Sequence, residues 1–204
     1  VGDASGLYSL QMNAMRNTIE QEPIGTKQTI FLDFNGEIFN GYVFGQQLAT
    51  TVRLPSMIDT LIDYGFDESD ENYLIDKIVG IVKEKLYALA YLGNNGHYSA
   101  DGRPGAFDVE ILNSRDHADP WGDKNVSRVI IGGGTADFVP GLYGLAESID
   151  IGNLVREETV VFLPATLFEP GGAVIADIPT APTKNIADLY SVVAGNIIVH
   201  EIGH

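Results

Sequence analysis

The chain has 204 residues, of which 45% are hydrophobic and 20% charged, and these proportions are ordinary for one globular domain with a full core. Its formal net charge of −16 gives a surface that repels phosphate backbones and anionic lipid, so we expect no nucleic-acid partner, and no apolar run is long enough for a membrane span. Cysteine is absent, which excludes disulfides, thiolate metal ligands and cysteine nucleophiles, so a metal must be held by His, Asp or Glu.

The first third of the chain predicts a weak helix, a strand and a short helix. Residues 5–20 predict the weak helix, which a proline and a glycine end, and residues 1–27 are interpreted as an N-terminal extension. The run TIFLDF at 29–34 predicts a strand closed by an Asn-Gly turn. Residues 56–64 then predict a short helix.

A long amphipathic helix is the clearest signal in the middle of the chain. Apolar residues recur at helical spacing from Leu74 to Leu89, after the acidic run DESDE at 67–71 and before Gly93, which suits a C-terminal cap. We therefore expect a backing helix at about 70–92. The acidic run also allows a structural Ca²⁺ site, although acidic side chains at a helix N-terminus are already favoured by the helix dipole.

Further strands are expected after this helix. Runs of apolar and β-branched residues predict them at 107–112, 127–132 and 159–164. The segment 143–148, between the last two, predicts a short edge strand. The polar loop 113–125 holds the only tryptophan, and it is either a place for ion binding, a cleft wall or a plain surface excursion.

The last segment, 185–204, predicts a helix. On a helical wheel four aliphatic side chains form one stripe, which His200 and His204 continue. The stripe consists of Ile186, Leu189, Val193 and Ile197. Other apolar residues point elsewhere on the wheel, so we expect this helix to be buried nearly all round and central in the fold.

The same segment ends in the letters HEIGH, residues 200–204, which fit the pattern H-E-x-x-H. Histidines at i and i+4 lie above one another on one helix face, so His200 and His204 can bind one Zn²⁺. Glu201 projects about 100° around the helix, where it can take a proton from water activated by the metal and pass it to the leaving amine. The plain alternative is two histidines satisfied by ordinary hydrogen bonds.

HEIGH and the order of predicted elements make the chain resemble the metzincin group of zinc metallopeptidases, whose fuller signature is H-E-x-x-H-x-x-G-x-x-H followed by a methionine turn. The order over residues 28–204 resembles the N-terminal, or upper, subdomain of that family. The resemblance implies a zincin-like α/β (α+β) fold with a twisted mixed sheet, a long backing helix and a central active-site helix. The stretch Tyr143, Gly144, Leu145 and Ala146 resembles the antiparallel edge strand that pairs with extended substrate in that family.

The resemblance implies a zinc-dependent endopeptidase that acts on a peptide or protein substrate, with Zn²⁺ on His200 and His204 and with Glu201 as general base. It also implies a secreted or periplasmic bacterial protein. The family's third zinc ligand and its lower subdomain would follow His204, so we expect these 204 residues to be a fragment of a longer enzyme. His97 and His117 are the alternative third ligands within the chain.

Two other functional classes remain open. The first is a non-catalytic zincin-like scaffold or binding domain, which the incomplete ligand set favours and the intact Glu201 disfavours. The second is an acidic calcium-binding surface or adhesion domain. It has less support, because the run DFNGE at 33–37 begins like an EF-hand loop and then departs from it.

Overall fold

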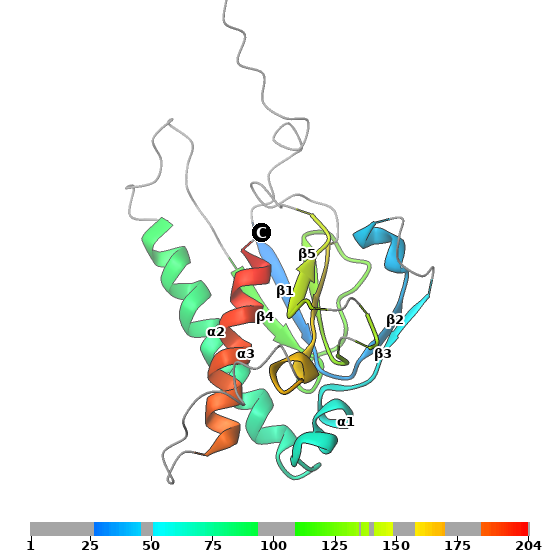
Figure 1. Cartoon of the computed structure of the whole chain (residues 1–204). Coiled ribbons are helices and arrows are strands. Elements are labelled where there is room, and N and C mark those ends of the chain that lie inside the picture. Colours follow the sequence, from blue (N-terminus) through cyan, green and yellow to red (C-terminus); the bar gives the residue numbers. More distant parts are fainter. Residues whose placement is uncertain are drawn as a thin grey trace, which may run out of the picture.

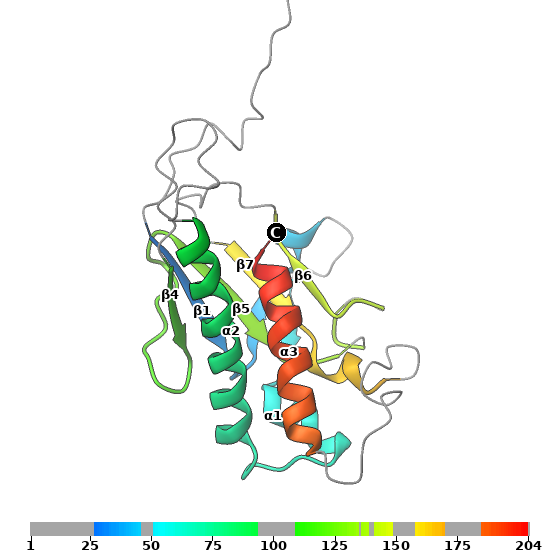
Figure 2. The same cartoon turned by 90° about the vertical axis from the view of Figure 1, so that its left-hand side faces the viewer.

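The structure is a computed structural model, which describes residues 27–45, 51–93, 109–134, 136–138, 141–148, 158–169 and 185–203. These residues form a five-stranded sheet with two long helices on one face and a smaller two-stranded sheet on the other (Figures 1 and 2). The predicted helix at 5–20, His97 and His204 lie outside the described residues. The expectation of an α/β (α+β) chain with a mixed sheet is therefore confirmed.

The main sheet has four parallel strands and one antiparallel strand. Its order is β4 (Val109–Asn113), β1 (Gln28–Asp33), β5 (Val126–Ile131), β7 (Glu158–Phe162) and β6 (Gly144–Ala146). β6 lies at one edge and runs antiparallel to β7, whereas the other neighbours are parallel. β5 and β7 are buried along their whole length, as expected of apolar strands that are covered on both faces. All five predicted strands are present, each within two residues of its expected bounds.

Two helices cover one face of this sheet. The predicted backing helix is α2 (Glu71–Gly93), which lies over β4, and the predicted C-terminal helix is α3 (Ile186–Ile202), which lies over β5, β6 and β7 (Figure 2). The helices approach closely at Gly195, where an added Cβ would lie 2.7 Å from Cγ2 of Ile81. Between the helices and the sheet lies the larger hydrophobic core, which includes Ile30, Val129, Phe162, Ile78 and Tyr190.

The acidic run at 67–71 forms the turn that precedes α2. Asp67 accepts a hydrogen bond from the backbone N–H of Ser69 at 2.7 Å, and Asp70 accepts one from the N–H of Asp67 at 3.1 Å. The bonds from Ser69 lower the pKa of Asp67. These carboxylates therefore serve the helix start, and a Ca²⁺ site there stays a prediction.

The opposite face of the main sheet carries elements that the sequence did not predict. β2 (Glu37–Phe39) and β3 (Val52–Leu54) pair antiparallel, and a 3-10 turn, η2 (Gly41–Phe44), follows β2. The aromatic rings of Phe39, Phe44 and Phe138 pack edge to face there, with centroids 5.4–5.9 Å apart. This small sheet seals a second core against Ile130 and Val161.

Short helical turns complete the fold. The helix predicted at 56–64 is α1 (Met57–Leu61) followed by the 3-10 turn η3 (Ile62–Tyr64), and Ser56 caps it by accepting from the N–H of Asp59. A further 3-10 turn, η4 (Pro164–Leu167), follows β7 and contacts α1.

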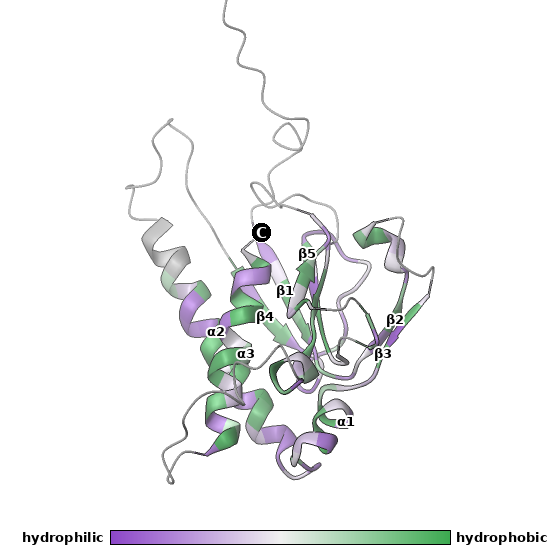
Figure 3. Ribbon diagram, viewed as in Figure 1, coloured by the Kyte–Doolittle hydropathy of each residue, from purple (hydrophilic) through white to green (hydrophobic). Residues whose placement is uncertain are grey.

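The prediction that α3 is buried on all sides is wrong. Ile186 and Val192 are 40% and 49% exposed, and His200 is exposed. The fully buried positions form a different face, which consists of Ala187, Tyr190, Ser191, Ala194, Gly195 and Ile198. A helical wheel that considers only bulky aliphatic residues does not identify this face, because several of its residues are small. These small residues are buried because they permit the close approach of α3 to α2 and the sheet. Hydrophilic and hydrophobic residues accordingly alternate along α3 (Figure 3).

Candidate functional site

The HEIGH motif occupies the last turn of α3. The helix is capped by Asn185, whose side-chain oxygen accepts from the N–H of Ala187 at 3.0 Å, and it continues without a break to Ile202. His200 and Glu201 are therefore helical, as predicted, whereas His204 lies outside the described residues. The side chain of His200 is exposed.

Glu201 lies on the other side of the same turn, directly against the edge strand. A Cβ added to Gly144 of β6 would lie 2.7 Å from Cγ of Glu201 and 2.9 Å from its carboxyl carbon, Cδ. The half-buried Glu201 thus touches the backbone of β6. The structure brings together two of the predicted site elements, the general base and the edge strand.

Two backbone hydrogen bonds fix the register of β6 on β7. The carbonyl of Tyr143 accepts from the N–H of Leu163 at 2.8 Å, and the N–H of Glu147 donates to the carbonyl of Thr159 at 3.0 Å. Tyr143 and Glu147, which flank β6, therefore point their backbone groups toward β7.

The alternation of an antiparallel ladder then assigns the remaining residues of the edge strand. Leu145 has the same parity and also faces β7, so the N–H and C=O groups of Gly144 and Ala146 point away from it. In the part of the chain that the structure describes, no strand lies on that outer side. Of the four predicted substrate-binding residues, Gly144 and Ala146 therefore offer backbone groups to an incoming strand, and Tyr143 and Leu145 do not.

The donor set fits zinc in chemical kind. Imidazole nitrogens suit Zn²⁺, and the exposed His200 offers one at the end of α3. Within the described ranges, no group of three or more His, Asp or Glu side chains is arranged to hold a metal ion. His204 and His97 lie outside those ranges.

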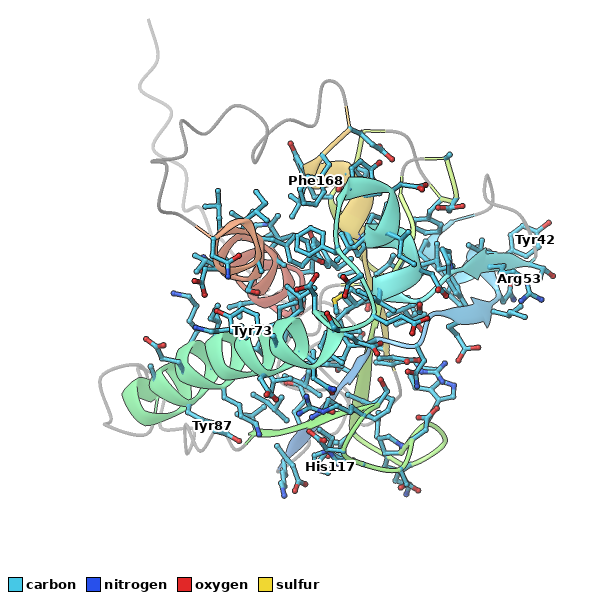
Figure 4. All side chains as sticks on the ribbon, turned by 90° about the horizontal axis from the view of Figure 1, so that it is seen from below. Tyr42, Arg53, Tyr73, Tyr87, His117 and Phe168 are labelled. Atoms are coloured by element: carbon cyan, nitrogen blue, oxygen red, sulfur yellow. The ribbon has the colours of Figure 1, made fainter. Side chains whose placement is uncertain are left out.

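His117 is held elsewhere in the fold. Its Nδ1 accepts from the N–H of Asn113 at 3.2 Å, and its side chain lines a pocket with Phe31 and Asp33 on the sheet face opposite the helices. Figure 4 shows it beside the loop that follows β4, away from α3. His117 is therefore not placed to complete a metal site with His200.

No family model, curated protein or solved structure matches the chain. The chemistry of the site therefore rests on its own residues. None of the described helices combines the length and the apolar character that a membrane crossing requires.

A second polar cluster lies on the far face of the sheet and was not predicted. Arg128 of β5 is 7% exposed, and its Nη2 contacts carboxylate oxygens of Glu37 at 2.8 Å and Asp119 at 2.7 Å. Its Nε lies 3.8 Å from Oδ2 of Asp33, and its guanidinium carbon lies 4.9 Å from the centre of the Trp121 ring. The desolvation of Asp33 raises its pKa, although a backbone hydrogen bond from Asn35 and the charge of Arg128 oppose that rise.

The role of this cluster is structural. It connects the β1–β2 turn and the tryptophan loop to β5, and the loop at 113–125 also forms part of the wall of the pocket beside Asp33. The signal in the sequence was the single arginine within the otherwise uncharged strand SRVII, since a lone charge in a buried strand requires partners.

Proposed function

We propose that the chain carries the zinc-binding helix and the substrate-binding edge strand of a zinc-dependent endopeptidase of metzincin type. The observation that carries the proposal is the contact between Glu201 of HEIGH and Gly144 of the antiparallel edge strand. A general base acts over hydrogen-bond distance, so it must lie beside the strand that holds the substrate. The mixed sheet with one antiparallel edge strand under α3 agrees with the fold that the resemblance implies.

His200 and His204 would hold Zn²⁺ through their imidazole nitrogens, and a third ligand would complete a catalytic site. Zn²⁺ bound there supplies a Lewis acid that polarises the scissile carbonyl and makes water more acidic. The side chain of His200 is exposed to solvent.

Glu201 performs the proton transfers in this proposal. Its carboxylate takes a proton from the attacking water and delivers it to the leaving amine as the peptide bond breaks. Its position in the last turn of α3, with its stem against β6, keeps it beside the substrate strand and on a different side of the helix from His200.

The substrate in this proposal is an extended peptide that adds a strand to the sheet beyond β6. The N–H and C=O groups of Gly144 and Ala146 point to that side and pair with the peptide backbone. Backbone pairing alone accepts many sequences, so selectivity arises from side-chain pockets elsewhere. We further propose that the enzyme acts outside the bacterial cytoplasm, either secreted or in the periplasm.

The proposal is tested with the natural enzyme that contains this chain together with a third zinc ligand, loaded with zinc. We expect one Zn²⁺ per chain by metal analysis, casein cleavage that a chelator abolishes, and a loss of about 10²- to 10⁴-fold in kcat on Glu201→Gln with the zinc content unchanged. A protein that binds stoichiometric zinc but cleaves nothing supports the non-catalytic scaffold instead. Cleavage that survives Glu201→Gln rejects this mechanism.

A further inference from the structure

The position of Glu201 depends on the absence of a side chain at Gly144. The Cβ of any other residue at position 144 would lie 2.7 Å from Cγ and 2.9 Å from Cδ of Glu201, closer than real carbon contacts allow. It would also lie 2.8 Å from the carbonyl oxygen of Val161 on the neighbouring strand. The space above Gly144 is therefore filled by the stem and carboxyl carbon of Glu201.

The φ angle at position 144 does not require a glycine. Gly144 is not among the described glycines with a positive φ, and it lies in a regular stretch of β6 paired with Phe162. A glycine inside a strand weakens it, because it adds backbone entropy and has no side chain to pack. Close approach of another group is the physical reason for a glycine at such a position, and here two groups approach, the side chain of Glu201 and the carbonyl oxygen of Val161.

We infer that Gly144 is a positioning residue, which fixes the carboxylate of Glu201 beside the substrate strand by letting the Glu201 stem lie on the backbone of β6. This role rests on the proposed peptidase function. Glu201 is half-buried and the α3 face beside it is packed by Ile198, so a side chain at 144 would displace the Glu201 stem from its place against β6. A displacement of about 1 Å at a catalytic group can cost about 100-fold in rate.

The test is a double-mutant cycle of Gly144→Ala and Glu201→Ala in the natural zinc-loaded enzyme that contains this chain. We expect Gly144→Ala to lower the melting temperature by about 4 °C or more when residue 201 is Glu, and by measurably less when it is Ala, since truncation removes the clash with Glu201 and leaves the clash with the Val161 carbonyl. Gly195→Ala is the matched control. Its Cβ meets Ile81 at 2.7 Å, so its effect on the melting temperature should be the same in both backgrounds.

The kinetic readout separates positioning from substrate pairing. Alanine keeps the backbone N–H and C=O that Gly144 presents to the peptide, so we expect Gly144→Ala to lower kcat by about 10- to 100-fold with KM changed by less than about threefold. In the Glu201→Ala background it should lower the residual rate no further. A wild-type kcat in folded Gly144→Ala, or equal losses of melting temperature in both backgrounds, overturns the inference.

The two readouts also distinguish the inference from the proposed function. If the zinc-loaded protein cleaves no peptide, the proposed function fails and the catalytic role of Gly144 fails with it. The coupled loss of melting temperature would still report the contact between residues 144 and 201. If cleavage depends on Glu201 but the cycle shows no coupling, the proposed function stands and the role of Gly144 is rejected.

Discussion

Arg128 and Asp33 face each other on neighbouring strands of the sheet, with 3.8 Å between Nε and Oδ2 and with side chains only 9% and 7% exposed. This distance is too long for a hydrogen bond, so the attraction between the two charges is not reinforced by one. The desolvation of Asp33 raises its pKa above the ordinary 3.8. A charged Asp33 therefore costs the folded state free energy, and Arg128 limits that cost.

Removing Arg128 should destabilise the fold more at neutral than at acidic pH. An acid whose pKa is raised in the folded state adds to the free energy of unfolding at pH values below its unfolded-state pKa. This stabilisation is lost as the pH rises through its folded-state pKa. Arg128→Gln raises the pKa of Asp33 further, so we expect a loss of about 3 kcal/mol in the free energy of unfolding at pH 7 and a smaller loss at pH 4, measured by urea titration. A loss that is equal at both pH values contradicts this assignment. Lys77→Gln, which breaks an exposed pair with Asp188, is the control, with an expected change below about 0.5 kcal/mol.

Asp116 should show the opposite pH dependence. Hydrogen bonds from Arg115, and then from Asn113, lower its pKa to about 2, and Arg115 also binds Asp76 of α2 at 2.6 Å. The stabilisation from Asp116 is therefore present above the unfolded pKa of 3.8 and is lost as the pH falls through about 2. We expect Asp116→Asn to melt at a lower temperature than the wild type at pH 6, with a difference that shrinks as the pH falls from 3.8 toward 2. A constant difference across this range would mean that the carboxylate charge is not responsible.

A pair of proline variants tests which edge-strand groups bind substrate. Ala146→Pro removes an N–H that points to the free edge, so the fold should tolerate it and KM should rise about 5- to 10-fold, the value of one hydrogen bond of about 1 kcal/mol. Leu145→Pro removes an N–H that faces β7 and should instead lower the melting temperature. The ladder assignment is wrong if Leu145→Pro is the better tolerated of the two.

Zinc binding should depend on His200 and His204 and not on His117. Loss of one imidazole removes a group that binds the metal directly. His200→Ala and His204→Ala should therefore each weaken zinc affinity by at least about 100-fold in a competition titration with a chromogenic chelator. His117→Ala should keep the wild-type affinity, because its ring lies in the turn after β4. If His117→Ala loses zinc as well, that histidine belongs to the metal site and the described arrangement is not the one that binds metal.

Tyr190 offers a test of the core. Its ring is completely buried against Phe66 and Phe168, and its hydroxyl has no hydrogen-bond partner among the described residues. Burial raises the pKa of the phenol, so it stays neutral. We expect Tyr190→Phe to increase the free energy of unfolding by about 1 kcal/mol, because it removes a buried polar group without a partner. A destabilisation of similar size would reveal a partner for the hydroxyl. Tyr73→Phe, which loses the bond to Asp188, is the control with the opposite sign.

The elements of the sheet and both long helices were predictable, because each carries a local pattern. Strands such as 29–34 are compact β-branched runs, and α2 has regular apolar spacing between an acidic start and Gly93. β2 and β3 were not predictable, since each has three residues and is stabilised by packing of Phe39 and Leu54 on the main sheet. Such contacts depend on the tertiary fold and leave no periodic signal.

The geometry of the candidate site was not predictable from the sequence. The spacing in HEIGH predicts a general base and two zinc ligands, and those roles stay predictions. The contact of Glu201 with Gly144 joins residues far apart in the chain, and only the packing of α3 on β6 reveals it. The buried face of α3 was predicted wrongly for a related reason. Ala194 and Gly195 are buried because they are small and lie close to neighbouring elements, and not because they are strongly hydrophobic.

The strand order also has a consequence for how the chain folds as it leaves the ribosome. β1 is synthesised first among the strands of the main sheet, yet both of its partners, β4 and β5, follow after the whole of α2. The apolar side chains of β1 therefore have no partner strand until β4 and β5 have been synthesised. α2 can form earlier, because its backbone hydrogen bonds join residues close in sequence. The edge strand and α3 come later still, so Glu201 can contact Gly144 only once the last helix has been synthesised.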